Sequence, residues 1–325
     1  MLSKYFGTGD FVLERLNGFI QKWIAVITPM SLAVGVMLGD FGAQFLFLIT
    51  FLFAFMTFTG ALGMDFKDFK TVLHHPAAIV ITLVFLHILM PVWAWLLASA
   101  IFDDPLYTIG FTLAVAVPTG VTSVIWVSVT RGNLPITLSI ILIDTLLAPI
   151  ILPLVLSIIS GEAVAVDNRE LIMGLIWMIV LPTLLGVILN HLTGGRVRET
   201  LGRPLAPFSK MSLMLIIMIN GSVISPYFYD FSGEIIGVLL LVLFITISGY
   251  AFALPVGHYL LKDPGVITAF TFNAGMRNIS VGVVIATAYF PAKVAMPVVF
   301  CMLFQQVMAS LFSKVIERYQ ARVGY

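Results

Sequence analysis

Two ionisable residues, Asp144 and Arg277, lie within long apolar segments of the sequence. Insertion scales put the cost of such a residue at the centre of a membrane helix at about 2.5–3.5 kcal/mol, so each needs a partner or water. A fixed guanidinium in such a place can hold an anion, and a carboxylate can balance its charge and exchange a proton. We expect Arg277 to contact an anionic ligand and Asp144 to take part in ion coupling. The alternative is a structural salt bridge between the two residues, without contact to a ligand.

Polar breaks interrupt two of the apolar segments, at residues 118–120 and 273–275. Proline and glycine can open a helix and leave backbone carbonyls free. We expect the two breaks together to form a binding site, whereas a single residue such as Thr122 is more simply explained as a link between helices. The helix-breaking residues are Pro118, Gly120 and Gly275. The side-chain donors and acceptors beside them are Thr119, Thr122, Ser123, Asn273 and Asn278.

Other polar residues in apolar segments give weaker indications. Thr137 precedes Asp144 by two helical turns and lies on the same face. His87 lies in the middle of an apolar segment, where we expect a packed, hydrogen-bonded histidine rather than a functional one. Gln305 and Gln306 either reach a ligand cavity or hold a neighbouring helix, and the sequence leaves both possibilities open.

The composition requires a membrane environment. The 325 residues are 60% hydrophobic and 10% charged, with a mean hydropathy of +1.08. Soluble domains carry about 25% charged residues, so this chain could not cover a water-facing surface. The net charge of +1 gives no reason to expect nucleic acid as a partner. A single cysteine, Cys301, excludes a disulfide within the sequence.

The hydrophobic pattern predicts an all-α membrane protein with ten transmembrane helices. A span needs roughly 20 mainly apolar residues, and the connections between the segments are short. We therefore expect residues 1–325 to form a single membrane transporter domain. The predicted spans are 20–38, 42–62, 77–101, 106–130, 134–159, 170–192, 209–226, 235–260, 264–288 and 292–313.

The basic residues orient these spans. With a cytoplasmic N-terminus, fourteen of the seventeen Lys and Arg residues fall on the inside, as the positive-inside rule requires. We expect a multi-pass protein of the inner (plasma) membrane with both termini in the cytoplasm. The fourteen are Lys4, Arg15, Lys22, Lys67, Lys70, Arg131, Arg196, Arg198, Arg203, Lys210, Lys262, Lys314, Arg318 and Arg322.

The two halves of the sequence resemble each other, which predicts a 5+5 repeat. Met90-Pro91-Val92 in the third span matches Leu254-Pro255-Val256 in the eighth, and the breaks fall in the fourth and ninth spans. The first repeat covers about residues 20–160 and the second about residues 170–315. An odd number of spans per repeat inverts the second copy, and inverted repeats with broken helices are typical of secondary transporters. Freed backbone groups persist at membrane depth only where they line a polar cavity.

Enzyme chemistry finds no support in the sequence. We identify no HExxH motif, no GxSxG motif and no paired carboxylates in the apolar segments. We therefore expect no catalytic residues and no cofactor.

Two stretches resemble the signatures of one transporter family. Pro118-Thr119-Gly120-Val121-Thr122-Ser123, continuing to Thr130-Arg131-Gly132-Asn133, resembles the P-G-G-x-x-S-N…A-R-G-N signature of bile acid:sodium symporters. Asn273-Ala274-Gly275-Met276-Arg277-Asn278 is similar to that family's E-x-G-M-Q-N crossover. The resemblance covers nearly the whole chain. It implies interleaved panel and core subdomains, a fourth and a ninth helix that cross at their breaks, two sodium sites behind the crossing, and transport of organic anions such as bile acids or pantoate-like acids.

The positions that match the family's sodium ligands are altered. Ser123 is retained and Thr137 replaces a serine, but Asn273 stands at the position of the family's glutamate and Arg277 at that of its glutamine. Sodium prefers a shell of oxygen ligands that includes an anionic member. We therefore expect no sodium cofactor, with Ser123, Thr137 and Asn273 as remnant sodium positions, and we expect Arg277 to replace a sodium ion electrostatically.

These observations predict a secondary carrier of a small organic anion that works by alternating access. We expect it to be sodium-independent, or coupled to a proton through Asp144, and to act as a monomer whose partners are the anion and the bilayer. The alternative is a channel or a transport-inactive sensor with the same fold. The expected substrate contacts are Thr119, Arg277, Asn278, Gln305 and Gln306. The candidates for an ion site or for coupling are Ser123, Thr137, Asp144, Asn273 and Met276.

Overall fold

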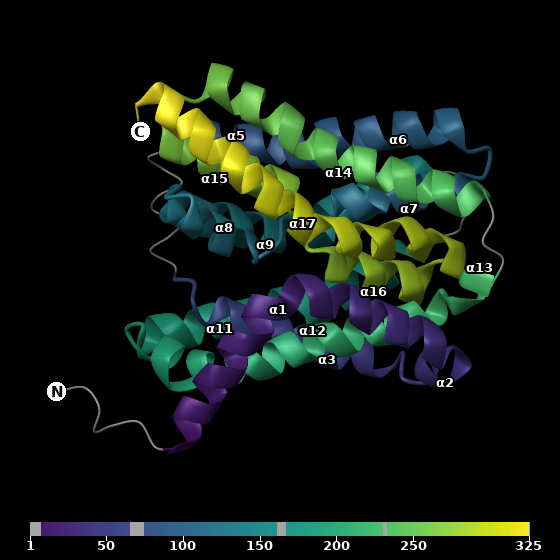
Figure 1. The fold of residues 1–325 in the computed structure, drawn as a ribbon, viewed down its shortest axis with the longest axis horizontal. Helices are drawn as coiled ribbons and strands as arrows, with labels where there is room; N and C mark the ends of the chain where they lie inside the picture. Colours follow the sequence, from purple (N-terminus) through teal and green to yellow (C-terminus); the bar gives the residue numbers. More distant parts are fainter. Residues whose placement is uncertain (1–7, 66–74, 161–166, 230–232, 325) are drawn as a thin grey trace. The chain divides into compact units, whose positions relative to one another are not determined.

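The computed structural model describes residues 8–65, 75–160, 167–229 and 233–324, and these residues are almost entirely helical (Figure 1). Three of the fourteen basic residues on which the predicted orientation depends lie outside the described residues: Lys4, Lys67 and Lys70.

The chain divides into two compact units that interleave in the sequence. Unit 1 comprises Met1–Phe66 and Trp177–Ser225, and unit 2 comprises Lys67–Ile176 and Pro226–Tyr325. Each unit therefore takes segments from both halves of the sequence. The chain passes between the units within η2 (Ile176–Val180) and within α13 (Ser225–Tyr229).

Six helical stretches of the described residues are long and apolar enough to cross a membrane. A seventh is added if Val12–Ile24 and Val26–Leu38, which meet at 80°, count as one span. The chain is thus an all-α, multi-pass membrane protein. The six stretches are Pro76–Ile101, Leu134–Ile159, Asn168–Leu192, Arg198–Val223, Gly233–Leu260 and Ala292–Val323.

Three of the ten expected spans do not coincide with one long helix. The expected span 42–62 falls on α2 (Asp40–Ala43) and α3 (Leu48–Ala61). The expected spans 106–130 and 264–288 fall on α7 (Pro105–Ala116) with α8 (Ser123–Val129) and on α15 (Pro264–Gly275) with α16 (Ile279–Tyr289). Because each half is too short to cross a bilayer alone, the count of ten stays a prediction.

The last expected span, 292–313, is too short. The helix there, α17, runs from Ala292 to Val323. Its additional turns are held by contacts within unit 2, since Ile316 is buried and Gln320 Nε2 donates hydrogen bonds to Thr130 O at 2.8 Å and Thr268 Oγ1 at 3.0 Å. The hydrophobic pattern missed these turns because polar contacts hold them.

Unit 1 is organised around a pair of helices in close contact. In Figure 1, α1 (purple) runs along α12, and α12 also packs on α2 and α3. The helix α11 covers another side of α3. Apart from α2 and α3, the helices of this unit are α1 (Thr8–Leu38), α11 (Leu181–Leu192), η3 (Arg198–Gly202) and α12 (Arg203–Val223).

Glycines allow α1 and α12 to approach each other. A Cβ atom at Gly35 would lie 2.1 Å from the carbonyl oxygen of Met218, and one at Gly221 would lie 2.7 Å from that of Leu32. The hydroxyl of Ser222 donates a hydrogen bond of 2.7 Å to the carbonyl of Gly35. Small residues are typical of such interfaces, because lipid provides no hydrophobic force that would bring two apolar helices together.

Unit 2 contains both of the polar breaks. Its helix α14 packs on α15 and α17, α6 packs on α7, and α7 also contacts α9 and α17 (Figure 1). Apart from α7, α8 and α15 to α17, its helices are α5 (Pro76–Val84), η1 (Phe85–Leu89), α6 (Met90–Ile101), α9 (Leu134–Ser160), α10 (Asn168–Leu175) and α14 (Gly233–Leu260).

The helices α7 and α15 begin in the same way. Asp104 accepts a hydrogen bond from the backbone N–H of Leu106, and Asp263 accepts one from that of Val266. A proline follows each aspartate as the first helical residue, where its missing N–H costs nothing. Burial alone would raise the pKa of Asp104, but Lys293, 2.7 Å away, and the backbone bond lower that pKa below its ordinary value.

The contact between α1 and α12 can be tested with one methyl group. Gly35→Ala should lower the midpoint of thermal unfolding in detergent, because overpacking a tight interface costs about 1–3 kcal/mol. Gly18→Ala lies on the same helix with no atom within 4 Å of the added Cβ. This control should be neutral or slightly stabilising, since alanine is the better helix former by about 1 kcal/mol. Equal midpoints for the two variants would contradict the close approach.

Candidate functional site

Two short extended segments of unit 2 separate helices that follow one another along the chain. Residues 117–122 separate α7 from α8, and residues 276–278 separate α15 from α16. Val117 and Met276, which follow the last residues of α7 and α15, both have extended backbone conformations. We call residues 117–122 and 276–278 the paired segments.

The backbones of the paired segments bind each other. Thr119 and Arg277 form an isolated antiparallel β-bridge. Free N–H and C=O groups are costly away from water, and this pairing provides partners for them. Two hydrogen bonds flank the bridge, from Gly120 N–H to Met276 O at 2.9 Å and from Asn278 N–H to Pro118 O at 2.7 Å.

Two glycines are required by this close packing. A Cβ atom at Gly120 would lie 2.8 Å from the carbonyl oxygen of Arg277. A Cβ atom at Gly275 would lie within 2.5 Å of the ring of Tyr250. The glycines of the two breaks therefore make room for a second backbone and for an aromatic ring.

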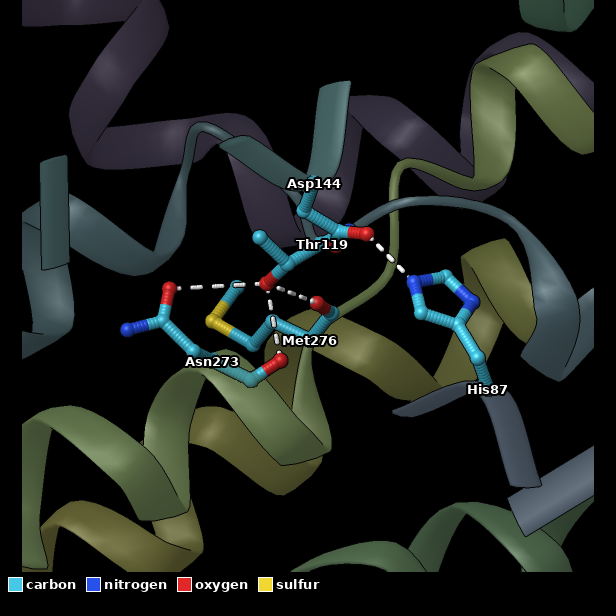
Figure 2. A network of polar contacts seen from close by, with 5 residues as sticks. All are labelled: His87, Thr119, Asp144, Asn273 and Met276. Carbon is cyan, nitrogen blue, oxygen red and sulfur yellow. Dashed lines mark hydrogen bonds and ion pairs between the residues drawn. The ribbon is translucent and has the colours of Figure 1, made fainter. Parts of the chain in front are cut away.

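Thr119 connects the paired segments to α9 and α15. Its hydroxyl lies 2.7 Å from the carbonyl of Asn273 and 3.0 Å from that of Met276. Its backbone N–H donates a hydrogen bond of 2.6 Å to Asp144 Oδ2. Figure 2 shows Thr119 between Asn273 and Asp144, so that one residue links both polar breaks to the buried carboxylate.

Asp144 is fully buried, and its other carboxylate oxygen pairs with a histidine. His87 Nε2 lies 2.5 Å from Asp144 Oδ1, and His87 reaches the carboxylate from the side opposite Asn273 (Figure 2). The expectation that His87 is packed and hydrogen-bonded is correct, but its partner was missed. The sequence carried one signal for this pair, a histidine and an aspartate each placed within an apolar span.

Arg277 is buried, with 5% of its surface exposed. Neither Nη1 nor Nη2 has a hydrogen-bond partner among the described residues. The alternative of a salt bridge to Asp144 is wrong, because His87 and Thr119 bind that carboxylate instead. Arg277 borders a cavity of about 30 Å³, whose lining includes Met90, Thr246, Gly249, Cys301 and Gln305.

The two glutamines of α17 have different partners. Gln305 lines the cavity and accepts a hydrogen bond of 2.9 Å from the backbone N–H of Arg277. Gln306 accepts a hydrogen bond of 3.2 Å from Trp126 Nε1. Gln305 therefore lies at the cavity, whereas Gln306 holds α8. The side chain of Asn278 is partly buried, and its backbone makes the contact to Pro118.

The remnant sodium positions are hydrogen-bonded within the protein. Ser123 donates a hydrogen bond of 3.0 Å to Asn273 Oδ1, and Asn273 Nδ2 donates one of 2.8 Å to the carbonyl of Ala269. The hydroxyl of Thr137 donates to the carbonyl of Asn133 in its own helical turn. The structure thus brings Ser123 and Asn273 together, and it gives Thr137 a separate partner.

Comparison with known proteins identifies related transporters. The description of the matching family model is "Sodium Bile acid symporter family", and the match covers residues 50–228. The chain is 41% identical over 298 residues to "Uncharacterized protein YbaS" of Bacillus subtilis (strain 168), which covers 91% of this chain and 97% of that protein.

More distant relatives carry transporter names. The "Uncharacterized sodium-dependent transporter YocS" of Bacillus subtilis (strain 168) is 23% identical over 84% of this chain and 85% of its own length. The "Probable sodium/metabolite cotransporter BASS1, chloroplastic" of Oryza sativa subsp. japonica is 26% identical over 70% of this chain and 55% of its own length.

The link made by the Thr119 hydroxyl predicts a stability effect. Thr119→Val should lower the midpoint of thermal unfolding, because loss of the donor leaves the buried carbonyl of Asn273 unsatisfied at a cost of about 1–3 kcal/mol. Thr112→Val is the matched control, since Thr112 is equally buried and donates only to the carbonyl of Thr108 in its own helix. A Thr119 variant no less stable than the Thr112 variant would show that this link is dispensable.

Proposed function

Because this chain belongs to the sodium bile acid symporter family, we propose that it is a secondary transporter of a small organic anion, such as a bile acid or a pantoate-like carboxylate, that works by alternating access. The chain is a multi-pass membrane transporter and not an enzyme. We further propose that transport does not require sodium. Relatives are named as sodium-dependent, so this is the property in which the chain would differ from them.

The unpaired guanidinium of Arg277 is the observation that carries the proposal. A buried cation is costly unless an opposite charge or hydrogen-bond acceptors compensate it. The two Nη atoms lack partners among the described residues, and the side chain borders a cavity. The planar guanidinium binds carboxylate and sulfonate oxygens through two parallel hydrogen bonds. An organic anion would supply the missing acceptors.

The cavity at Arg277, of about 30 Å³, is far smaller than the roughly 300–1,000 Å³ of ordinary ligand pockets. An organic anion therefore requires the surrounding helices of unit 2 to separate. Alternating access supplies such a movement, since the binding site must open toward one side of the membrane at a time.

The ten-span inverted repeat is part of the proposal. The two halves of unit 2 support it, because α7 and α15 share an aspartate cap, an initial proline and a length of 12 residues. Both end at a paired segment, so the fourth and ninth spans would be interrupted helices that cross. Units 1 and 2 would correspond to the panel and core subdomains.

The residues at the remnant sodium positions support sodium independence. Asn273 provides no negative charge, and its side-chain oxygen already accepts a hydrogen bond from Ser123. Arg277 places a positive charge next to this residue pair, where it repels a cation. The guanidinium would therefore perform the electrostatic role that sodium has in related carriers.

The distribution of the basic residues along the sequence leads to a proposal for the membrane location and orientation of the chain. We propose that the chain lies in the inner membrane as a monomer with both termini in the cytoplasm. The concentration of Lys and Arg in alternate connections supports this orientation.

Counterflow in proteoliposomes tests the transport function. Liposomes loaded with unlabelled taurocholate or pantoate should take up the labelled form of that anion with saturation, at the same rate in sodium and in choline buffer. A channel or a transport-inactive sensor would show no saturable counterflow. Uptake that depends fully on sodium would reject the proposed sodium independence and leave anion transport intact.

Replacement of Arg277 tests the anion site. Arg277→Gln should weaken binding of the same two anions at least tenfold, or make binding sensitive to sodium, because removing a buried charged partner costs about 2–5 kcal/mol. Arg277→Lys keeps the charge but loses the paired donors, so its affinity should be intermediate. Arg203→Gln is the control, since Arg203 is exposed and pairs with Glu199. Unchanged affinity and ion dependence in Arg277→Gln would make this residue purely structural.

A further inference from the structure

His87 lies in an unusual turn of an otherwise regular membrane helix. Residues Phe85–Leu89 form a π-helical turn between α5 and α6, with His87 at its centre. Two more such turns, η2 and η3, occur among the described residues, and each of the three ends two residues before a proline, which removes a regular helical hydrogen bond. The turn directs His87 Nε2 to within 2.5 Å of Asp144 Oδ1, while 9% of the residue is exposed. The helix thus departs from its regular form at the residue that contacts the buried carboxylate.

The imidazole of His87 has an unused nitrogen. His87 Nδ1 is buried and has no hydrogen-bond partner among the described residues. With Asp144 ionised, Nε2–H donates to the carboxylate and Nδ1 retains its lone pair. A proton can bind at Nδ1 without breaking the contact to Asp144, and the pair then changes from a net charge of −1 to zero. Histidine is the side chain that changes charge between about pH 5 and pH 8.

Few other charges face this pair. Of the helices packed against η1 and α9, α5, α6, α8 and α15 carry no titratable side chain, and α9 carries only Asp144. The helix α10 carries Arg169 and Glu170, next to its contact with Ser157, more than three helical turns along α9 from Asp144. Tyr107 of α7 lies at the far end of that helix, with Lys293 4.5 Å from its ring. The remaining groups are near the cavity, where Tyr250 and Cys301 neighbour Arg277. Arg277 is therefore the cation that balances the pair within unit 2.

The charges of the pair and of Arg277 determine when a proton is favoured. With Asp144 ionised and His87 neutral, the carboxylate and the guanidinium sum to zero. A monovalent anion at Arg277 leaves a net charge of −1 in a poorly solvated interior, which is costly. One proton at His87 restores neutrality. Anion binding and proton binding therefore favour each other through charge.

A direct structural connection also joins the two sites. Asp144 Oδ2 accepts the backbone N–H of Thr119 at 2.6 Å, and Thr119 forms the β-bridge with Arg277. A change in the charge of the His87–Asp144 pair alters the strength of this hydrogen bond. The paired segments thus link the protonation of His87 to the residue at the cavity.

From this geometry we propose that His87 and Asp144 form a proton site that takes up one proton with each monovalent anion bound at Arg277. The proton binds His87 Nδ1 and is released when the anion leaves, so the chain is an electroneutral proton–anion symporter. This inference rests on the proposed anion transport, and it assigns to His87 a role beyond the packing expected from the sequence.

The first test follows the protonation of His87 with and without taurocholate or pantoate. The protein is labelled with ¹⁵N-histidine, placed in nanodiscs and titrated between about pH 5 and pH 8, the range in which histidine changes charge. Signals absent from His87→Gln are assigned to His87. The share of cationic imidazole at a given pH should rise when either anion is added, because anion binding favours the proton. His87 signals that stay constant across the range both with and without the anions would overturn the proposal.

The second test measures coupling in proteoliposomes with labelled pantoate and taurocholate. An inward proton gradient of one pH unit should drive about tenfold accumulation in the wild type, because one unit corresponds to a factor of ten at equilibrium. His87→Gln should abolish this accumulation, and any counterflow that the variant retains should need a higher anion concentration and no longer depend on pH, because no proton can compensate the bound anion. His258→Gln, which alters a histidine bonded to Tyr319, should behave as the wild type.

The outcomes separate the two proposals. A His87→Gln variant that accumulates the anion like the wild type, or whose counterflow keeps the pH dependence of the wild type, contradicts the coupling role. If the wild type shows no counterflow with either anion, the proposed transport function fails, and the ¹⁵N titration alone decides whether His87 and Asp144 bind a proton.

Discussion

The backbone pairing between residues 117–122 and 276–278 is the interaction on which the site depends. Helices that stop within an apolar environment leave N–H and C=O groups that lipid cannot satisfy. Here the two stretches satisfy each other through the bridge between Thr119 and Arg277 and the hydrogen bonds beside it. Gly120 permits this approach, since a side chain there would collide with the carbonyl of Arg277. Once the pairing forms, Arg277 and Asp144 are held on either side of one short segment.

This arrangement separates the two buried charges instead of pairing them. Asp144 receives hydrogen bonds from His87 and from the backbone of Thr119, whereas Arg277 borders a small cavity and both of its Nη atoms lack partners among the described residues. A direct salt bridge would have neutralised both groups and left little affinity for a ligand. The acidic group is instead associated with a histidine, and the basic group is the one to which we assign the anion under the proposed function.

The chain belongs to a sodium symporter family, although position 273 carries an asparagine and no carboxylate. The Asn273 amide connects to Ser123 and to a carbonyl of its own helix, so it holds the same packing that a ligand residue would need. A fixed cation on the neighbouring segment can replace the electrostatic effect of a bound one. Under the proposed function, the fold is retained while the coupling ion changes.

The sequence alone determined the features that depend on composition and local pattern. Apolar content required a membrane protein, and proline and glycine predicted one interruption at 118–120, within the observed 117–122. The second interruption was predicted three residues too early, at 273–275, because α15 continues through Gly275 and the helix is interrupted at 276–278. The tertiary structure decided which groups meet. The contact between His87 and Asp144 joins residues 57 positions apart and depends on the rotation of two helices and on a π-helical turn. No local pattern encodes that rotation, because it results from the packing of the whole of unit 2.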